Sequence, residues 1–209
     1  MKIAVLATDL LKEEFLSKKI PSDIELIMVD SFFQFSLIKN ADAYFDFEFE
    51  MNKERILQLH SLLPKPVFIN SVINTLDEID ESFIRIIAWP TFLKRNICEI
   101  AAQENNKKTA REIFDKLEWN YHFVPDETGM ISARIIAMVI NEAYYTFEEN
   151  VSTKNEIDIA MKLGTNYPYG PFEWSEKIGV KNIYNLLLRL RKTETRYTIS
   201  KILEKEASK

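Results

Sequence analysis

Glycine is scarce in this chain, and its distribution is uneven. Only four glycines occur among 209 residues, and residues 1–128 contain none. A phosphate-binding turn uses glycines so that the phosphate can approach backbone N–H groups at a helix N-terminus. Because residues 1–128 contain no glycine, they cannot form an ordinary glycine-rich phosphate loop. Three of the four glycines fall within residues 160–179.

Cysteine and histidine are nearly absent as well. The one cysteine, Cys98, excludes a disulfide framework and fits a reducing cytoplasm. A catalytic thiol needs a partner such as histidine, and the only histidines are His60 and His122. Cys98 lies in an apolar stretch that we expect to be helical, so we expect a buried thiol without a chemical role.

Long apolar runs and basic clusters are also missing. No apolar run reaches 18 residues, which predicts no membrane-spanning helix, and acidic residues follow the N-terminus too early for a signal peptide. The net charge of −5 and the lack of a basic patch argue against a nucleic-acid partner. In residues 189–205 glutamates interrupt the basic side chains, which is typical of a solvated helix face.

The first half of the chain alternates between strand and helix patterns. Residues 3–7 and 24–29 are short apolar runs typical of buried strands, and residues 10–16 between them have helical spacing. Such a β-α-β unit is how a Rossmann domain begins. Further strands are expected at residues 44–50, 66–70, 83–88 and 119–124, and helices at 52–63, 95–103 and 107–117.

Residues 44–50 alternate strictly between aromatic and acidic side chains. The alternation predicts a strand with one packed face and one wet face. Asp46, Glu48 and Glu50 would share the wet face. Neither histidine nor cysteine is close in sequence and the spacing is not that of a cation loop, so we interpret these carboxylates as solvated and expect no metal.

A turn cluster at residues 125–129 separates this part from a purely helical one. We expect an α/β domain at residues 1–125 and an all-α domain at residues 126–209. The helical patterns cover residues 131–149, 157–163, 183–190 and 197–203, and Thr153 with Glu156 forms a capping box before the second. Gly164 is expected to close that helix in the left-handed conformation, Pro171 to begin the next, and Gly179 to end it.

The second half resembles a known family. The run from Lys162 through Gly164 and Pro168 to Gly170-Pro171, together with Asn141-Glu142-Ala143, is similar to the dimerising C-terminal domain of 3-hydroxyacyl-CoA dehydrogenases. The resemblance implies a Rossmann-like N-terminal domain, an all-α C-terminal domain and a homodimer formed through the C-terminal helices. We expect the glycines, prolines and the Asn-Glu-Ala triplet to preserve the fold rather than to carry chemistry.

The resemblance also implies a site and NAD as its cofactor. Thr8 follows the first strand, where the family binds the dinucleotide, and Asp30 ends the second strand, where it binds the adenosine ribose. Asn70 and Ser71 fall where the family binds substrate. Glu99 matches the glutamate that orients the catalytic histidine, which we expect on a helix.

Several family features are replaced. Residues 86–90 stand in place of the catalytic histidine segment, with an isoleucine in place of the base, and Ala133 stands in place of the catalytic asparagine. Thr8, Asp9 and the two leucines after them replace the glycine-rich turn. The helical hairpin that helps to hold CoA is missing after Asp30.

These replacements favour a divergent relative without NAD-dependent dehydrogenase activity, which binds acyl-CoA, another small molecule or a partner protein. Two alternatives stay open. One is an atypical NAD(P)-dependent 3-hydroxyacyl-CoA oxidoreductase in which Thr8 offers its hydroxyl to a phosphate. The other is a non-redox enzyme that uses Glu99, Asn70, Ser71 and Asp30 in a cleft between the domains.

Overall fold

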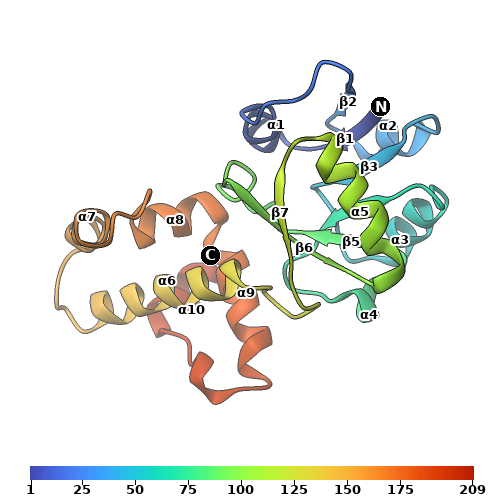
Figure 1. Ribbon diagram of the computed structural model, residues 1–209. Coiled ribbons are helices and arrows are strands. Elements are labelled where there is room, and N and C mark those ends of the chain that lie inside the picture. Colours follow the sequence, from blue (N-terminus) through green and yellow to red (C-terminus); the bar gives the residue numbers. More distant parts are fainter. The chain divides into compact units, whose positions relative to one another are not determined.

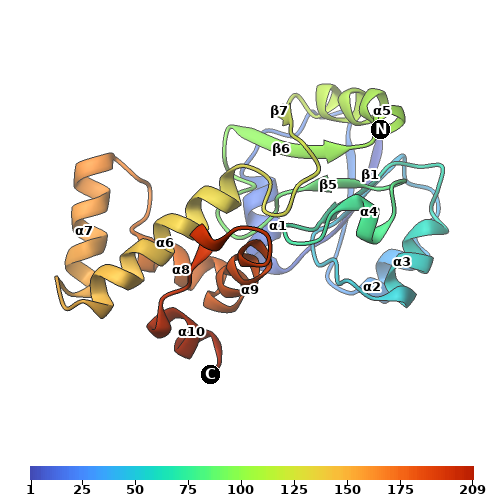
Figure 2. The same cartoon turned by 90° about the horizontal axis from the view of Figure 1, so that it is seen from below.

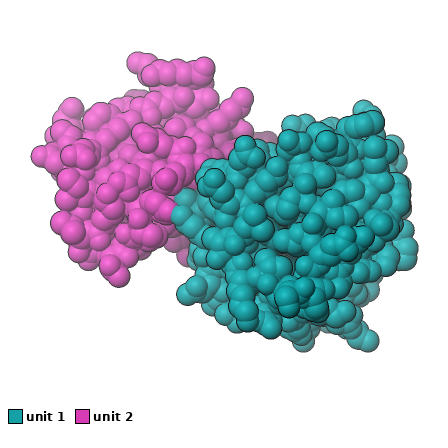
Figure 3. Space-filling model, turned by 90° about the horizontal axis from the view of Figure 1, so that it is seen from above, with its two compact units in different colours: residues 1–130 teal, residues 131–209 magenta.

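The structure is a computed structural model that describes all 209 residues. The chain forms two compact units, residues 1–130 and residues 131–209 (Figure 3). The division lies close to the turn cluster that the sequence marks as a domain boundary. The first unit is α/β and the second is all-α, which confirms the predicted fold class.

The N-terminal unit is built on a seven-stranded sheet with the order β2-β1-β3-β4-β5-β6-β7. The first five strands are parallel, β6 runs antiparallel to β5, and β7 is parallel to β6. The order 2-1-3-4-5 is a doubly wound pattern, in which the strand order reverses between β1 and β3. The strands are β1 (Lys2–Leu6), β2 (Glu25–Val29), β3 (Ala43–Asp46), β4 (Val67–Asn70), β5 (Ile84–Ile86), β6 (Ile97–Ala102) and β7 (Asn120–Phe123).

Helices cover both faces of this sheet (Figure 2). Apolar residues of α1 (Asp9–Leu16) and α5 (Glu104–Lys116) pack on one face. Those of α2 (Phe32–Leu37), α3 (Lys53–His60) and α4 (Leu76–Ile79) pack on the other. The first core is rich in aromatic rings, with Phe45 stacked on Phe68 at 4.3 Å between ring centroids. The two layers bury the middle strands on both sides.

The predicted helix at residues 95–103 is wrong, because these residues form strand β6. Cys98 and Ile100 are two residues apart and both pack into the same apolar core, because every second side chain of a strand points to the same face. A short apolar run does not distinguish strand from helix by itself. Cys98 is buried as expected, and burial raises the pKa of its thiol to about 11, so the thiol stays protonated at neutral pH.

The predicted wet face at residues 44–50 is also wrong. β3 ends at Asp46, lies between β1 and β4, and is buried on both faces. Asp46 is fully buried and forms a two-bond ion pair with Arg55, at 2.8 and 2.7 Å. Burial raises the pKa of Asp46 to about 6 in spite of the opposing effect of this guanidinium. Asp46 therefore belongs to the interior and not to a solvated surface.

The C-terminal unit is organised around its longest helix, α6 (Ser132–Glu148) (Figure 1). The other helices of the unit contact α6, and they are α7 (Lys154–Thr165), α8 (Pro171–Ile178), α9 (Val180–Arg191) and α10 (Lys201–Ala207). Asn141 on α6 donates to the Thr198 carbonyl at 2.8 Å and accepts from the Ser200 N–H at 3.0 Å. The asparagine thus fixes the segment that leads into α10, which supports a structural role for the Asn-Glu-Ala triplet.

The corner between α7 and α8 differs from expectation at Gly164. This glycine is helical, and α7 continues to Thr165 and ends at Asn166, whose φ of 56° is left-handed. Asparagine tolerates that conformation better than most residues, so it replaces glycine as the cap. The two other expectations are confirmed, because Pro171 opens α8 and Gly179 ends it with a φ of 92°.

Glycine is required at position 170 because the Asp158 side chain lies close to its backbone, and not because of its dihedral angles. The buried Asp158 caps α8 by accepting from the N–H groups of Phe172 at 2.8 Å and of Glu173 at 3.1 Å. A Cβ atom on residue 170 would lie 2.3 Å from the Asp158 side chain. No side chain fits there unless the cap moves.

We expect Gly170→Ala to lower the free energy of unfolding by about 2–4 kcal/mol, because it combines overpacking with loss of the Asp158 cap. Gly164→Ala is the matched control. A Cβ there meets nothing within 4 Å, and replacing a glycine with helical dihedral angles by alanine should stabilise by up to about 0.5–1 kcal/mol. Urea unfolding monitored by circular dichroism measures both. Equal stability of the two variants would contradict the role of Asp158.

Candidate functional site

The sequence-predicted site residues lie along one edge of the sheet. Asp30, Thr8 and Asn70 follow the carboxyl ends of β2, β1 and β4, and Ser71 comes directly after Asn70. Glu99 joins this edge because β6 is antiparallel to β5. Five strand spacings of about 4.8 Å separate β2 from β6, which places Asp30 and Glu99 roughly 24 Å apart. The two ends of this row cannot act on the same small group.

Thr8 lies at the N-terminal end of α1, but its surroundings do not fit a dinucleotide. Its side chain makes no capping hydrogen bond, and its N–H donates to Glu48 Oε1 at 3.1 Å. Asp9 begins α1 and adds a second carboxylate. Asp30 is exposed beyond β2, as a ribose-binding residue would need to be. The residues at the end of β1 nevertheless place negative charge where NAD would bring its phosphates.

Asn70 and Ser71 are occupied by main-chain contacts. The Asn70 amide donates to the carbonyls of Phe47 and Ala88, at 3.1 and 3.3 Å, and accepts from the Ala88 N–H at 3.0 Å. The Ser71 hydroxyl donates to the Asn74 carbonyl at 2.8 Å. These bonds join the ends of β3, β4 and β5. A substrate could recruit either side chain only by displacing them, and the substrate-binding role of both residues stays a prediction.

Glu99 has an apolar neighbour, Ile87, from the segment that the resemblance sets in place of the catalytic histidine segment. Across the antiparallel pair β5–β6 its strand partner is Ile87, whose N–H donates to the Glu99 carbonyl at 3.4 Å. Ile87 is buried, and its side chain can neither take nor give a proton. Glu99 thus lies on a strand, where we expected a helix, and beside an isoleucine.

His122 is the neighbour of Glu99 that the sequence did not reveal. In the parallel pair β6–β7, His122 lies directly beside Glu99, and its side chain is exposed. We expected this histidine in the strand at residues 119–124, and nothing in the sequence indicated that it would lie next to Glu99. Only the register between β6 and β7 brings the two residues together, and no sequence pattern specifies that register.

Arg85 is the second residue of this region that sequence reasoning missed. Its fully buried guanidinium donates to the carbonyls of Ser71 at 2.8 Å, Val72 at 3.2 Å and Glu127 at 3.3 Å, and pairs with Asp126. Burial lowers the pKa of Arg85, while Asp126 opposes that shift. The available signal was a lone arginine inside the apolar run of residues 83–88.

Two further features of the resemblance can be located in the structure. The six-residue helix α2 is the only helix between β2 and β3, so no helical hairpin is present there. Ala133 lies in the first turn of α6, and its methyl group cannot form hydrogen bonds.

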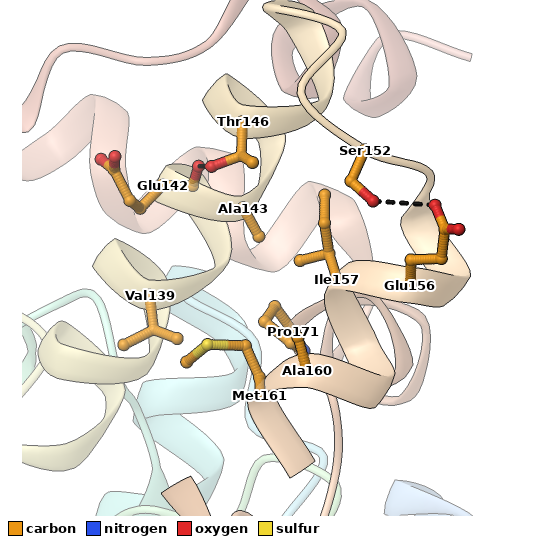
Figure 4. Close-up of a pocket in the computed structure, with 10 residues that line it drawn as sticks. All are labelled: Val139, Glu142, Ala143, Thr146, Ser152, Glu156, Ile157, Ala160, Met161 and Pro171. Atoms are coloured by element: carbon orange, nitrogen blue, oxygen red, sulfur yellow. Dashed lines mark hydrogen bonds between the residues drawn. The ribbon is translucent and has the colours of Figure 1, made fainter. Parts of the chain in front are cut away.

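The C-terminal unit has a mostly apolar pocket of about 410 Å³ (Figure 4). Val139 and Ala143 of α6 face Ile157 and Met161 of α7 across it. At its rim the Ser152 hydroxyl donates to Glu156 at 2.8 Å. A second hollow of about 460 Å³ shares Val139 and Glu142 and extends along α6. The two hollows meet on α6 at Val139 and Glu142, and Ile135, which lines the second one, is 55% exposed.

Comparison with known proteins agrees with this architecture. Residues 129–209 match the family model described as 3-hydroxyacyl-CoA dehydrogenase, C-terminal domain. The chain is 40% identical over 86 residues to 3-hydroxyadipyl-CoA dehydrogenase from Escherichia coli (strain K12), which is 40% of this chain and 18% of that protein. It is 33% identical over 112 residues to 3-hydroxybutyryl-CoA dehydrogenase from Clostridioides difficile, which is 51% of this chain and 40% of that protein. The matched part spans less than half the length of these curated relatives.

The fold is also found among solved structures. (S)-3-hydroxybutyryl-CoA dehydrogenase PaaH1 from Ralstonia eutropha superposes with a TM-score of 0.74 at 13% identity, covering 99% of this chain and 93% of that one. FadB2 from M. tuberculosis gives a TM-score of 0.72 at 12% identity, covering 88% and 70%.

Fold and sequence matches together define the class of protein. A Rossmann-like sheet is followed by a 3-hydroxyacyl-CoA dehydrogenase C-terminal domain. The resemblance read from residues 160–179 is therefore confirmed: residues 129–209 match the 3-hydroxyacyl-CoA dehydrogenase C-terminal domain, and the chain as a whole has the fold of 3-hydroxyacyl-CoA dehydrogenases.

We expect Arg85→Met to lower the free energy of unfolding by about 3–5 kcal/mol, because Asp126 and three carbonyls would lose a buried charged donor. Arg111→Met is the control, since Arg111 is exposed on α5 and its loss should change stability by less than about 0.5 kcal/mol. Urea unfolding compares them. A loss below about 1 kcal/mol in Arg85→Met would show that the hydrogen bonds and the ion pair of Arg85 contribute little to stability.

Proposed function

We propose that this protein is a divergent 3-hydroxyacyl-CoA dehydrogenase-like protein that does not catalyse NAD-dependent dehydrogenation. In this proposal it keeps the family fold to bind an acyl-CoA, another small molecule or a partner protein. The observation that carries the proposal is the pairing of Ile87 with Glu99 across β5 and β6.

Oxidation of a hydroxyl group by hydride transfer requires a base that accepts the hydroxyl proton. A positioned general base contributes about 10²–10⁴ in rate, and an isoleucine contributes none of it. Ala133 removes the other catalytic side chain that the family uses. NAD itself, if it were bound, would supply the hydride acceptor, but the carboxylates at the end of β1 oppose its phosphates.

The cellular setting belongs to the same proposal. None of the helices is long and apolar enough to cross a membrane. Cys98 is a free, buried thiol, so the fold contains no disulfide that an oxidising compartment would have to form. On this basis we propose a cytoplasmic location.

A second candidate function is a non-redox enzyme acting on a thioester. The specific observation in its favour is the position of His122 beside Glu99 on neighbouring strands. A carboxylate beside an imidazole is a common arrangement for general acid–base chemistry. This chemistry would use the same sheet edge but would need no nucleotide.

Two assays together test the two candidates. We expect the purified protein to form no NADH, measured by absorbance, from NAD and 3-hydroxybutyryl-CoA. We expect no release of free CoA from acetoacetyl-CoA, measured with a thiol reagent. NADH formation would contradict the proposed function, whereas CoA release that disappears in His122→Asn would favour the second candidate. Thermal unfolding with each CoA ester tests binding separately, since a ligand at about 100 times its Kd stabilises by about 2.7 kcal/mol.

We further propose that the protein is a homodimer formed through the C-terminal helices. The apolar residues that α6 contributes to the two adjoining hollows, with Ile135 among them, support this assembly. Exposed contiguous apolar patches usually mark interaction surfaces. In a symmetric dimer the same surface of both copies would be buried together.

Ile135→Asp should therefore convert the protein from dimer to monomer, because a carboxylate would have to be buried in the interface. The matched control is Leu57→Asp, at a leucine of α3 that is 71% exposed in the other unit. Light scattering coupled to size-exclusion chromatography gives the mass of each form. A monomeric wild type, or a dimeric Ile135→Asp variant, would refute this assembly.

A further inference from the structure

Two turns meet where the order of strands reverses. β1 lies between β2 and β3, so the β1–α1 turn and the chain segment after β3 lie side by side at the same edge of the sheet. In open α/β sheets this point leaves a crevice beyond the strand ends, and ligands bind there. In this protein the point is bridged by a contact between Thr8 and Glu48.

The contact lies directly after the last backbone hydrogen bonds that join β1 to its two neighbouring strands. The Leu6 carbonyl accepts from the Phe47 N–H at 2.9 Å, and the Ala7 N–H donates to the Val29 carbonyl at 3.2 Å. Thr8 carries the next N–H group, which donates to Glu48 Oε1 at 3.1 Å. A carboxylate is thus bonded at the N-terminal end of α1, where the helix dipole and backbone N–H groups favour an anion.

Glu48 is held in this position by a buried ion pair. Its own N–H donates to Asp46 Oδ1 at 3.2 Å, and its carbonyl accepts from Arg55 Nη2 at 3.1 Å. Arg55 is bonded to both carboxylate oxygens of Asp46, and its guanidinium lies 3.5 Å from the centroid of the Phe32 ring. The backbone N–H and the carbonyl of Glu48 are therefore both held by hydrogen bonds, so the backbone that carries the Glu48 side chain is fixed.

We propose that the Glu48 carboxylate takes the place of a dinucleotide phosphate at the end of β1, and that this contact closes the N-terminal unit to nucleotides. An incoming phosphate would find the Thr8 N–H already bonded and would meet a like charge. Asp9, whose side chain is 98% exposed, adds a second negative charge in the first turn of α1, which Lys12 offsets in part through an ion pair at 3.7 Å. The inference concerns entry of a cofactor and does not depend on the base that the segment with Ile87 lacks.

The proposal predicts that removing Glu48 opens an anion site. The probe is inorganic pyrophosphate, titrated by calorimetry into the full-length wild type, Glu48→Ala and Glu50→Ala. We expect Glu48→Ala to bind pyrophosphate about tenfold or more tightly than the wild type, the factor expected when one unit charge is removed from beside an anion near a protein surface. Glu50→Ala removes the same charge two residues away, from a side chain that is exposed, and should bind like the wild type.

A second measurement tests the contact without any ligand. In ¹H–¹⁵N spectra the Thr8 amide proton should move upfield in Glu48→Ala, because it loses a charged acceptor, and should stay in place in Glu50→Ala. Equal pyrophosphate affinity of wild type and Glu48→Ala, an equal gain in Glu50→Ala, or an unmoved Thr8 amide would each overturn the proposal. Failure here leaves the absence of a base at Ile87 untouched, whereas NADH formation by the wild type would refute the proposed function on its own.

Discussion

The buried guanidinium of Arg85 is the interaction on which the edge of the sheet depends. Removing such a charge from water costs several kcal/mol, and the cost is offset only when hydrogen bonds surround the ion. Here three carbonyls and the Asp126 carboxylate surround it. Asp126 also accepts from the Leu76 N–H at 2.7 Å and so begins α4. One side chain therefore fixes the loop after β4, the start of α4 and the end of the N-terminal unit.

This arrangement limits what the site residues can do. Ser71 offers its carbonyl to Arg85 and its hydroxyl to Asn74, and Asn70 joins the ends of three strands. Side chains that hold main-chain segments together are poorly placed to exchange partners during a reaction. The edge of the sheet is more rigid, and more fully satisfied by its own bonds, than the polar residues of the sequence suggest.

The sequence predicted much of the fold because local patterns determine much of it. The β-α-β start, the long helix α6 and the Pro171–Gly179 helix follow from apolar periodicity and from the backbone preferences of proline and glycine. The failures have a common cause in tertiary context. β6 and the double burial of β3 depend on which strands lie beside them, and Asn166 rather than Gly164 ends α7 because the corner bends two residues later.

The candidate site was predictable only in what it lacks. The missing glycines and the isoleucine in place of histidine can be read directly from the residues. The Glu48–Thr8 bond could not be read, because the alternation of residues 44–50 suggested one continuous strand. The strand ends at Asp46 since its carboxylate pairs with Arg55 on α3, and this turn redirects Glu48 toward β1. The same applies to His122, whose place beside Glu99 is a matter of strand register.

The two halves of the chain also differ in how strictly their folds constrain sequence. In the C-terminal unit the structure depends on particular atoms: Gly170 leaves room for Asp158, and Asn141 bonds both an N–H and a carbonyl. A sheet covered by helices requires apolar side chains of suitable size, and many residues satisfy that requirement. Family resemblance therefore remains visible in residues 129–209, while the sheet keeps its shape with little trace of the family in its sequence. If the protein binds no nucleotide and has no catalytic base, as we propose, its strand ends are free of those constraints. Charged residues such as Glu48 and Arg85 are then compatible with a fold that does not depend on the chemistry.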